Sequence, residues 1–255
     1  MKKIFIVILV LISLVSIRSQ TLYEKGFKEY DNAHFEAAIK LFTSSIEKNE
    51  KVVDSYIYRG MSYLLLENAN EAKKDLDKAY EIDPDNLGIN GYYGKYFYAT
   101  DQYGKALENY NIALSKKPNN YSLYSERAGT KAMLGMYSEA MKDADVAVKN
   151  SPSDYNVYLN RGYVKLRLEK YSEAVEDFNQ SLKIEESHKG YGNRGTAYAL
   201  LKKYDLAIND FNKALKYNPN DLLVLYYQGE VYLAKGEKIK ACENFLKSKL
   251  SASVS

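Results

Sequence analysis

The sequence is poor in the residues that build disulfides and metal sites. Its 255 residues include one cysteine, two histidines and no tryptophan. A single cysteine excludes an internal disulfide and every zinc site built from several cysteines. The two histidines, His34 and His188, are too far apart in the sequence to suggest a His-rich metal cluster. We therefore expect no metal and no cofactor.

An excess of charge of either sign is also missing. Lys and Arg number 36 against 33 Asp and Glu, but Lys2, Lys3 and Arg18 lie in an N-terminal stretch without acidic residues. The rest of the chain has 33 residues of each sign and is formally neutral. Because a protein that binds nucleic acid needs a basic surface to neutralise phosphates, nucleic acid is not an expected partner.

Residues 1–19 have the pattern of a secretory signal peptide. Two lysines precede an uncharged run of residues 4–17, and the small Ser19 precedes a cleavage point at Gln20. The alternative is an uncleaved membrane anchor, but a spanning helix needs about 20 apolar residues and this run stops at Arg18. We expect export without membrane insertion after cleavage. The abundance of Lys, Asn, Ile and Tyr suggests a bacterial periplasm or envelope.

Alanine recurs along the rest of the chain at spacings of 34, 34, 34, 34, 33 and 34 residues. The column comprises Ala38, Ala72, Ala106, Ala140, Ala174, Ala207 and Ala241. Twelve residues before each alanine lies a small residue, namely Gly26, Gly60, Gly94, Ala128, Gly162, Gly195 and Gly229. Apolar residues within each period are three and four apart, which predicts two amphipathic helices and no strand. The paired small residues let the two helices approach closely.

Proline marks the end of the period. All four prolines lie twelve residues after an alanine of the column, where proline ends the second helix. They are Pro84, Pro118, Pro152 and Pro219. The pattern predicts seven repeats, near residues 19–52, 53–86, 87–120, 121–154, 155–187, 188–221 and 222–255.

This pattern resembles the tetratricopeptide repeat (TPR). The match consists of the 34-residue period, an aromatic residue at position 4, Gly at position 8, Tyr or Phe at position 17, Ala at position 20 and Pro at position 32. The aromatic residues at position 4 are Tyr56, Tyr124, Tyr158 and Tyr191. The resemblance covers about 237 of the 255 residues. It implies an all-α superhelix, a single solenoid of seven helix-turn-helix units over residues 20–255.

Arginine occurs at position 7 only in repeats that have aspartate at position 23. The four pairs are Arg59 with Asp75, Arg127 with Asp143, Arg161 with Asp177, and Arg194 with Asp210. A row of ligand-binding arginines would give no reason for the matched aspartates. We therefore expect a structural ion pair between the two helices of each of these repeats.

The resemblance also implies where a ligand binds. Family members contact ligands from positions 2, 5, 9, 12 and 13 of the first helices, which line a concave groove. In this chain that row includes Tyr23, Phe27, Ile57, Met61, Leu64, Lys95, Tyr98, Met133, Leu159, Tyr163, Arg167, Tyr226 and Glu230. An extended peptide or an amphipathic helix fits such a groove. The alternative is that part of the row packs against neighbouring first helices.

Some family members grip a C-terminal carboxylate with a cluster of Asn, Lys and Arg. The corresponding positions hold Tyr23, Phe27, Tyr58, Gly88 and Tyr92 in repeats one to three, and Ser125, Gly129, Asn160, Lys189 and Asn193 in repeats four to six. Neither set rebuilds the clamp. Recognition of a chaperone tail is therefore not expected.

Enzyme motifs are missing or lack their context. Gly190, Gly192 and Gly195 spell the dinucleotide fingerprint, but that motif needs a preceding strand. Cys242 lies beside the alanine column without a nearby histidine, so we expect a small core residue and no nucleophile.

We therefore expect an exported, non-enzymatic scaffold that binds a peptide or a partner protein in its groove. The alternative is a glycan- or cell-wall-binding envelope protein that uses groove tyrosines. A homodimer through the outer face of repeat one is a further possibility.

Overall fold

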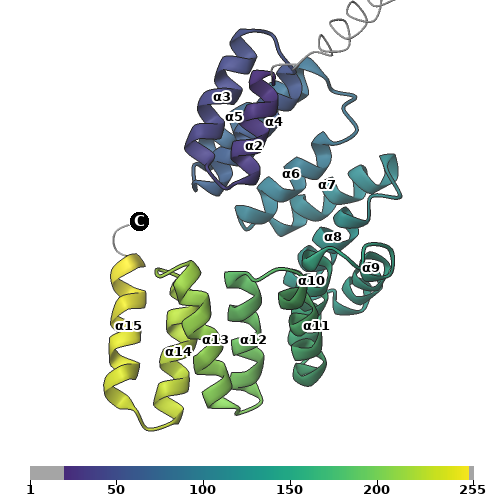
Figure 1. The fold of residues 1–255 in the computed structure, drawn as a ribbon. Coiled ribbons are helices and arrows are strands. Elements are labelled where there is room, and N and C mark those ends of the chain that lie inside the picture. The colour runs from purple at the N-terminus through teal and green to yellow at the C-terminus, as the bar shows by residue number, and fades with distance from the viewer. Residues whose placement is uncertain (1–19, 253–255) are drawn as a thin grey trace, which may run out of the picture. The chain divides into compact units, whose positions relative to one another are not determined.

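The computed structural model describes the backbone of residues 20–252 and the side chains of residues 20–248, so the predicted signal peptide lies outside the described residues. The described residues form fourteen helices and no strand (Figure 1), which confirms the all-α prediction. None of these helices is long and apolar enough to cross a membrane. The helices are α2 (Leu22–Asp31), α3 (Phe35–Glu47), α4 (Val52–Leu65), α5 (Ala69–Ile82), α6 (Ile89–Ala99), α7 (Tyr103–Lys116), α8 (Tyr121–Met133), α9 (Tyr137–Asn150), α10 (Tyr155–Arg167), α11 (Tyr171–Ile184), α12 (His188–Leu200), α13 (Tyr204–Tyr217), α14 (Leu222–Ala234) and α15 (Lys238–Ala252).

The chain divides into two compact units between Thr100 and Asp101. The first unit contains helices α2 to α6 and the second contains α7 to α15. The boundary falls inside the third predicted repeat, between its two helices. That residues 20–255 form one continuous solenoid stays a prediction.

Within each unit the helices pack in the order that the repeats predict. The two helices of one repeat contact each other in the pairs α2/α3, α4/α5, α8/α9, α10/α11, α12/α13 and α14/α15. The first helices of successive repeats also lie side by side, α2, α4 and α6 in the first unit and α8, α10, α12 and α14 in the second. We call the surface that these helices form in each unit the first-helix face.

Complementary side-chain sizes set the close approach of the two helices in a repeat. A Cβ atom added to Gly162 would lie 2.7 Å from the ring of Phe178, which is fully buried on the second helix. Repeat four instead has Ala128 in the first helix and Ala144 opposite, both fully buried. A small residue on one helix therefore faces a large one on the other, or two alanines share the space.

The turn after each first helix contains a residue in the left-handed conformation. These residues have φ between 58° and 80° and are Ala33, Glu67, Asp101, Gly135, Glu169, Lys202 and Gly236. A left-handed residue lets the next amide groups satisfy the last carbonyl groups of the helix. In repeat two, for example, the N–H of Asn68 donates to the carbonyl of Tyr63 at 2.8 Å. Because only two of these residues are glycine, the sequence does not mark most of the turns.

Candidate functional site

The four arginines and four aspartates that recur in the sequence meet as pairs. The Nε and Nη2 groups of Arg161 donate to the two carboxylate oxygens of Asp177, at 2.9 and 2.7 Å. The same side-on geometry joins Arg59 to Asp75, Arg127 to Asp143 and Arg194 to Asp210, with distances between 2.6 and 2.8 Å. The aspartate side chains are 2–8% exposed and the arginines 17–21%. Hydrogen bonding to Asp75 and Asp177 raises the pKa of Arg59 and Arg161 above the ordinary arginine value.

Position 7 also connects each repeat to the one before it. From repeat two to repeat seven, its side chain donates a hydrogen bond to the residue at position 25 of the preceding repeat. The six bonds run from Arg59 to Thr43, Tyr93 to Asp77, Arg127 to Asn111, Arg161 to Asp145, Arg194 to Asn179 and Gln228 to Asn212, at 2.7–3.2 Å. We call these bonds the inter-repeat ladder. Sequence reasoning missed it, although a polar residue at position 25 in repeats one to six was a usable signal.

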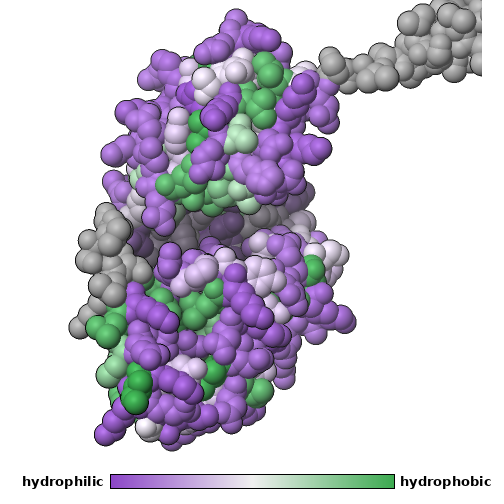
Figure 2. Space-filling model, turned by 60° about the vertical axis from the view of Figure 1, so that its left-hand side comes forward, coloured by the Kyte–Doolittle hydropathy of each residue, from purple (hydrophilic) through white to green (hydrophobic). Residues whose placement is uncertain are grey.

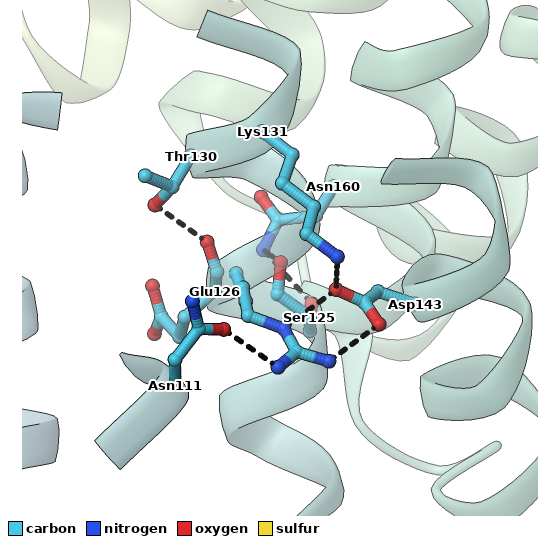
Figure 3. A network of polar contacts seen from close by, with 8 residues as sticks. Asn111, Ser125, Glu126, Thr130, Lys131, Asp143 and Asn160 are labelled. Atoms are coloured by element: carbon cyan, nitrogen blue, oxygen red, sulfur yellow. Dashed lines mark hydrogen bonds and ion pairs between the residues drawn. The ribbon is translucent and has the colours of Figure 1, made fainter. Parts of the chain in front are cut away.

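Repeats four and five add a lysine to the buried aspartate. Lys131 donates to Asp143 and Lys165 to Asp177, both at 2.8 Å. Figure 3 shows Lys131 and Asn111 on either side of the Asp143 network. Each ladder arginine also lies over the tyrosine three residues earlier, with 5.2–5.9 Å between the guanidinium carbon and the ring centroid. These charges are therefore satisfied inside the repeat array, where they hold helices together.

Aromatic side chains cluster on the first-helix face of the first unit. Tyr58 of α4 lies 4.9 Å from Phe27, 5.4 Å from Tyr30, 6.3 Å from Tyr23 and 5.8 Å from Tyr92, measured between ring centroids. These four contacts have interplanar angles of 61–90°, so the rings meet edge to face. All five side chains are partly exposed. We call Tyr23, Phe27, Tyr30, Tyr58 and Tyr92 the aromatic cluster.

Three phenol groups of the aromatic cluster, those of Tyr23, Tyr30 and Tyr92, are held neutral by their surroundings. Burial raises the pKa of Tyr23, Tyr30 and Tyr92 above the usual tyrosine value. The Tyr92 hydroxyl donates to the Tyr58 hydroxyl at 3.0 Å, which raises the pKa of Tyr92 further. Nearby charges act on two of the rings, since Asp54 raises the pKa of Tyr23 and Lys95 partly offsets the rise at Tyr30. These three phenols thus add no charge to the surface of the cluster.

The structure places the predicted groove residues in two classes. Ile57, Met61 and Leu159 are only 2, 6 and 6% exposed. The prediction that these three residues line the binding groove is therefore corrected. Neighbouring helices cover Ile57 and Leu159 at position 5 and Met61 at position 9, so they belong to the core. Tyr23, Phe27, Leu64, Lys95, Tyr98, Met133 and Tyr163 are partly exposed, and Arg167, Tyr226 and Glu230 are exposed. That these accessible residues contact a ligand stays a prediction.

The first-helix face of the second unit is more polar. The Asn160 amide donates to the Ser125 hydroxyl at 2.8 Å and to the Ser125 carbonyl at 3.2 Å, which joins α10 to α8. The Tyr163 hydroxyl donates to the sulfur of Met133 at 3.0 Å, and Arg167 donates to that hydroxyl at 3.2 Å. Hydrogen bonds between repeats therefore occupy several of the groups that could hold a ligand.

Repeat seven exposes large apolar side chains at positions where earlier repeats are mostly polar. Leu223 is 62% exposed, Ile239 79% and Leu246 59%. Leu246 occupies position 25 and cannot accept a hydrogen bond, so the inter-repeat ladder ends here. On the face that Figure 2 presents, hydrophobic residues likewise gather in patches within a mostly hydrophilic surface.

Two further sequence predictions concern reactive groups. Cys242 is exposed, so the prediction of a core residue is wrong. It follows the buried Ala241, and one step along a helix turns the side chain by about 100°, here toward solvent. Across residues 20–252 no three His, Cys, Asp or Glu side chains lie close enough to hold a metal ion.

Three segments of the chain match models of the same protein family. Residues 53–86, 155–188 and 188–221 each match a family model described as tetratricopeptide repeat. Human tetratricopeptide repeat protein 6 is 32% identical over 104 residues, and Hsp70-Hsp90 organizing protein 1 of Glycine max is 32% identical over 100 residues. These matches cover 40% and 39% of this chain but only 20% and 18% of those relatives. The matched part of the chain thus spans about a fifth of their length.

Solved structures agree on the fold. A tetratricopeptide repeat protein from Parabacteroides merdae superposes with a TM-score of 0.66 at 20% identity, covering 90% of this chain and 91% of that one. PilW, a type IV pilus biogenesis factor, gives a TM-score of 0.65 at 18% identity, covering 81% of this chain and 96% of that one. Identities this low show the fold alone. The three family matches identify tetratricopeptide repeats in the chain, which therefore belongs to the tetratricopeptide repeat proteins, and the solved structures agree with that fold.

Proposed function

We propose that the chain is an exported, non-enzymatic scaffold that binds an extended peptide segment of a partner protein on its first-helix face. Tetratricopeptide repeat proteins act as protein–protein interaction scaffolds. The observation that carries the proposal for this chain is the aromatic cluster, in which three adjacent first helices present five partly exposed rings. Aromatic residues supply much of the binding energy where proteins meet, because they bury a large area with few rotatable bonds.

The mostly buried arginines of the repeat array do not form a binding surface for an acidic ligand group. The ladder arginines are engaged with aspartates and with the preceding repeat, which leaves them poorly placed for a ligand. The Hsp70-Hsp90 organizing proteins are relatives in sequence, but the positions of a carboxylate clamp hold Tyr23, Phe27, Tyr58, Gly88 and Tyr92 in the first unit. The proposed ligand is therefore an internal, extended segment and not a C-terminal carboxylate.

Export is part of the proposal and rests on the sequence of residues 1–19. Two lysines, an uncharged run and a small residue before Gln20 form the expected order of a cleaved signal. Cleavage would free the first repeat, whose first helix α2 follows the N-cap Thr21. Mass spectrometry of the mature N-terminus in the producing cell tests this part, and a mature chain that retains Met1 would contradict it.

Glycan binding is the second candidate function, because partly exposed tyrosines also stack on sugars. The geometry favours it less. Four contacts of the Tyr58 ring have interplanar angles between 61° and 90°, so the rings of the cluster mostly meet one another edge to face. A sugar ring stacks over the whole of a flat ring face, whereas a peptide side chain also fits against a ring edge or part of a face.

A peptide display selection against residues 20–255 separates these functions. The variant carries Phe27→Leu and Tyr30→Leu, which keep apolar volume, and the matched control carries Tyr217→Leu, a 54% exposed tyrosine of α13. We expect peptides that bind the wild type and the control but not the variant. Peptides that bind all three chains equally would contradict the proposed face. Retention on envelope polysaccharide without any peptide would support the glycan-binding function instead.

A further inference from the structure

The formally neutral chain has an acidic half and a basic half. Residues 20–100 contain fourteen acidic and ten basic residues, a net charge of −4. Residues 101–255 contain nineteen acidic and twenty-three basic residues, a net charge of +4. The aromatic cluster lies in the acidic unit. A binding surface selects partners of opposite charge, because like charges brought together raise the free energy of the complex.

Two carboxylates flank the aromatic cluster at its ends. Asp54, in the first turn of α4, is four residues before Tyr58 and therefore lies on the same side of that helix, and it also raises the pKa of Tyr23. Asp31, the last residue of α2, is four residues after Phe27 and lies on the same side of α2 as that ring. Unlike Asp75 and Asp177, neither of them has an ion-pair or hydrogen-bond partner among the side chains of residues 20–248. The rim of the cluster thus carries two carboxylates without an ion-pair partner in the described chain, and the one lysine there that acts on its rings is Lys95, beside Tyr30.

Ring faces in this chain hold cations elsewhere. Each ladder arginine lies over a tyrosine ring, and Lys73 lies over the ring of Tyr93 at 5.7 Å. A cation within about 6 Å of a ring centroid is attracted by the negative face of the ring. Among the described residues no lysine or arginine occupies this position over Tyr23, Phe27 or Tyr30. The aromatic cluster therefore combines partly exposed rings with carboxylates, and no cation of the described chain lies over the rings of Tyr23, Phe27 or Tyr30.

We infer that the first unit binds a basic peptide segment, whose Lys or Arg side chains lie against the aromatic cluster and pair with Asp54 and Asp31. This inference rests on the proposed function and specifies its ligand. A neutral segment would leave both carboxylates without an ion-pair partner, and an acidic segment would be repelled by them. A basic side chain satisfies them and covers the rings with its own methylene groups.

The helix geometry sets the spacing of the basic residues. Asp54 is at position 2 and Asp31 at position 13, eleven residues apart in repeat numbering. At 1.5 Å of rise per residue this corresponds to roughly 16 Å along neighbouring helices. An extended peptide covers about 3.3 Å per residue, so basic residues about five positions apart reach both carboxylates.

Fluorescence anisotropy of labelled peptides with residues 20–255 tests the inference. The probe is a serine- and alanine-based peptide with two lysines five positions apart, compared with the same peptide carrying serine or glutamate in place of lysine. The variants are Asp54→Asn and Asp31→Asn, and the control is Glu47→Gln, an exposed acid on the second helix α3. All three substitutions remove one negative charge from the same unit, so only their place distinguishes them.

We expect the lysine peptide to bind most tightly and to weaken as salt is added. Each aspartate variant should weaken it about two- to fivefold, and the Glu47→Gln control should leave it unchanged. Equal affinity for the lysine and serine peptides, with no effect of either aspartate, would overturn the inference while leaving peptide binding intact. Binding of no peptide at all would overturn both proposals. The chain could instead associate with itself in a salt-sensitive way that Asp54→Asn abolishes. That result would show that the surface binds the basic unit of a second copy and would also overturn the inference.

Discussion

The buried ion pairs allow a prediction of unequal stability losses at chemically identical sites. Arg59→Met leaves Asp75 without a cation, because repeat two has Tyr63 where repeats four and five have a lysine. Asp75 is 8% exposed in its side chain, and breaking a buried pair typically costs about 3–5 kcal/mol. Arg161→Met leaves Asp177 bound to Lys165 at 2.8 Å, so we expect a smaller loss of about 1–3 kcal/mol.

Urea unfolding followed by circular dichroism measures the free energy of unfolding of each variant. Because repeat arrays unfold in parts, amide hydrogen exchange in α5 and α11 locates the loss in the affected repeat. The matched control is Lys165→Met, alone and combined with Arg161→Met. The double variant should lose as much stability as Arg59→Met. A double-mutant cycle of Arg161→Ala and Asp177→Ala should also show coupling above about 0.5 kcal/mol.

Two results would refute this reasoning. Equal losses for Arg59→Met and Arg161→Met would show that the lysine does not compensate the buried carboxylate. Additive effects of Arg161→Ala and Asp177→Ala would show that the hydrogen bonds at 2.9 and 2.7 Å carry no net coupling.

Four further predictions follow from packing, backbone and charge. Gly162→Ala should lower the free energy of unfolding by about 1–3 kcal/mol, because its methyl group would meet the Phe178 ring. In a chain that already carries Phe178→Ala the same substitution should cost much less, and equal costs in calorimetry would contradict the packing. Glu67→Gly should raise stability by about 0.5–1 kcal/mol, since φ is 61° there; a lower melting temperature would count against it. Ser181→Ala should be neutral or stabilising by up to about 1 kcal/mol, because the buried hydroxyl has no hydrogen-bond partner in the described chain; a clear loss in urea would reveal a missed partner. Burial lowers the pKa of His188 below its unfolded value of 6.5, so its contribution to stability is present above that pH and is lost as pH falls. His188→Gln should therefore lose less stability between pH 7.5 and 5 than the wild type, and equal slopes would refute the assignment.

The helix pairs could be predicted from the sequence because their contacts need particular residue sizes. Gly162 and Ala174 mark the close approach of α10 and α11, and a 34-residue period repeats that mark along the chain. The turns could not be predicted in the same way. Glu67 and Lys202 adopt the left-handed conformation although neither is glycine, since the helices on both sides impose it.

The binding face could be predicted only in part. Position 5 holds the partly exposed Tyr23 in repeat one, but the buried Ile57 in repeat two, because repeat one has no repeat packed on its outer side among the described residues. The aromatic cluster gains Tyr58 and Tyr92 from position 6 instead. A list of fixed repeat positions therefore does not predict which side chains are accessible, because the neighbours of each first helix differ from repeat to repeat.

Amide hydrogen exchange of residues 20–255 with the lysine peptide tests the central claim, that a partner segment binds on the first-helix face of the first unit, most directly. The account predicts slower exchange in α2, α4 and α6 when the peptide is present, and no such change with Phe27→Leu and Tyr30→Leu. Protection confined to α8–α14, or to the apolar surface of repeat seven around Leu223 and Leu246, would contradict it.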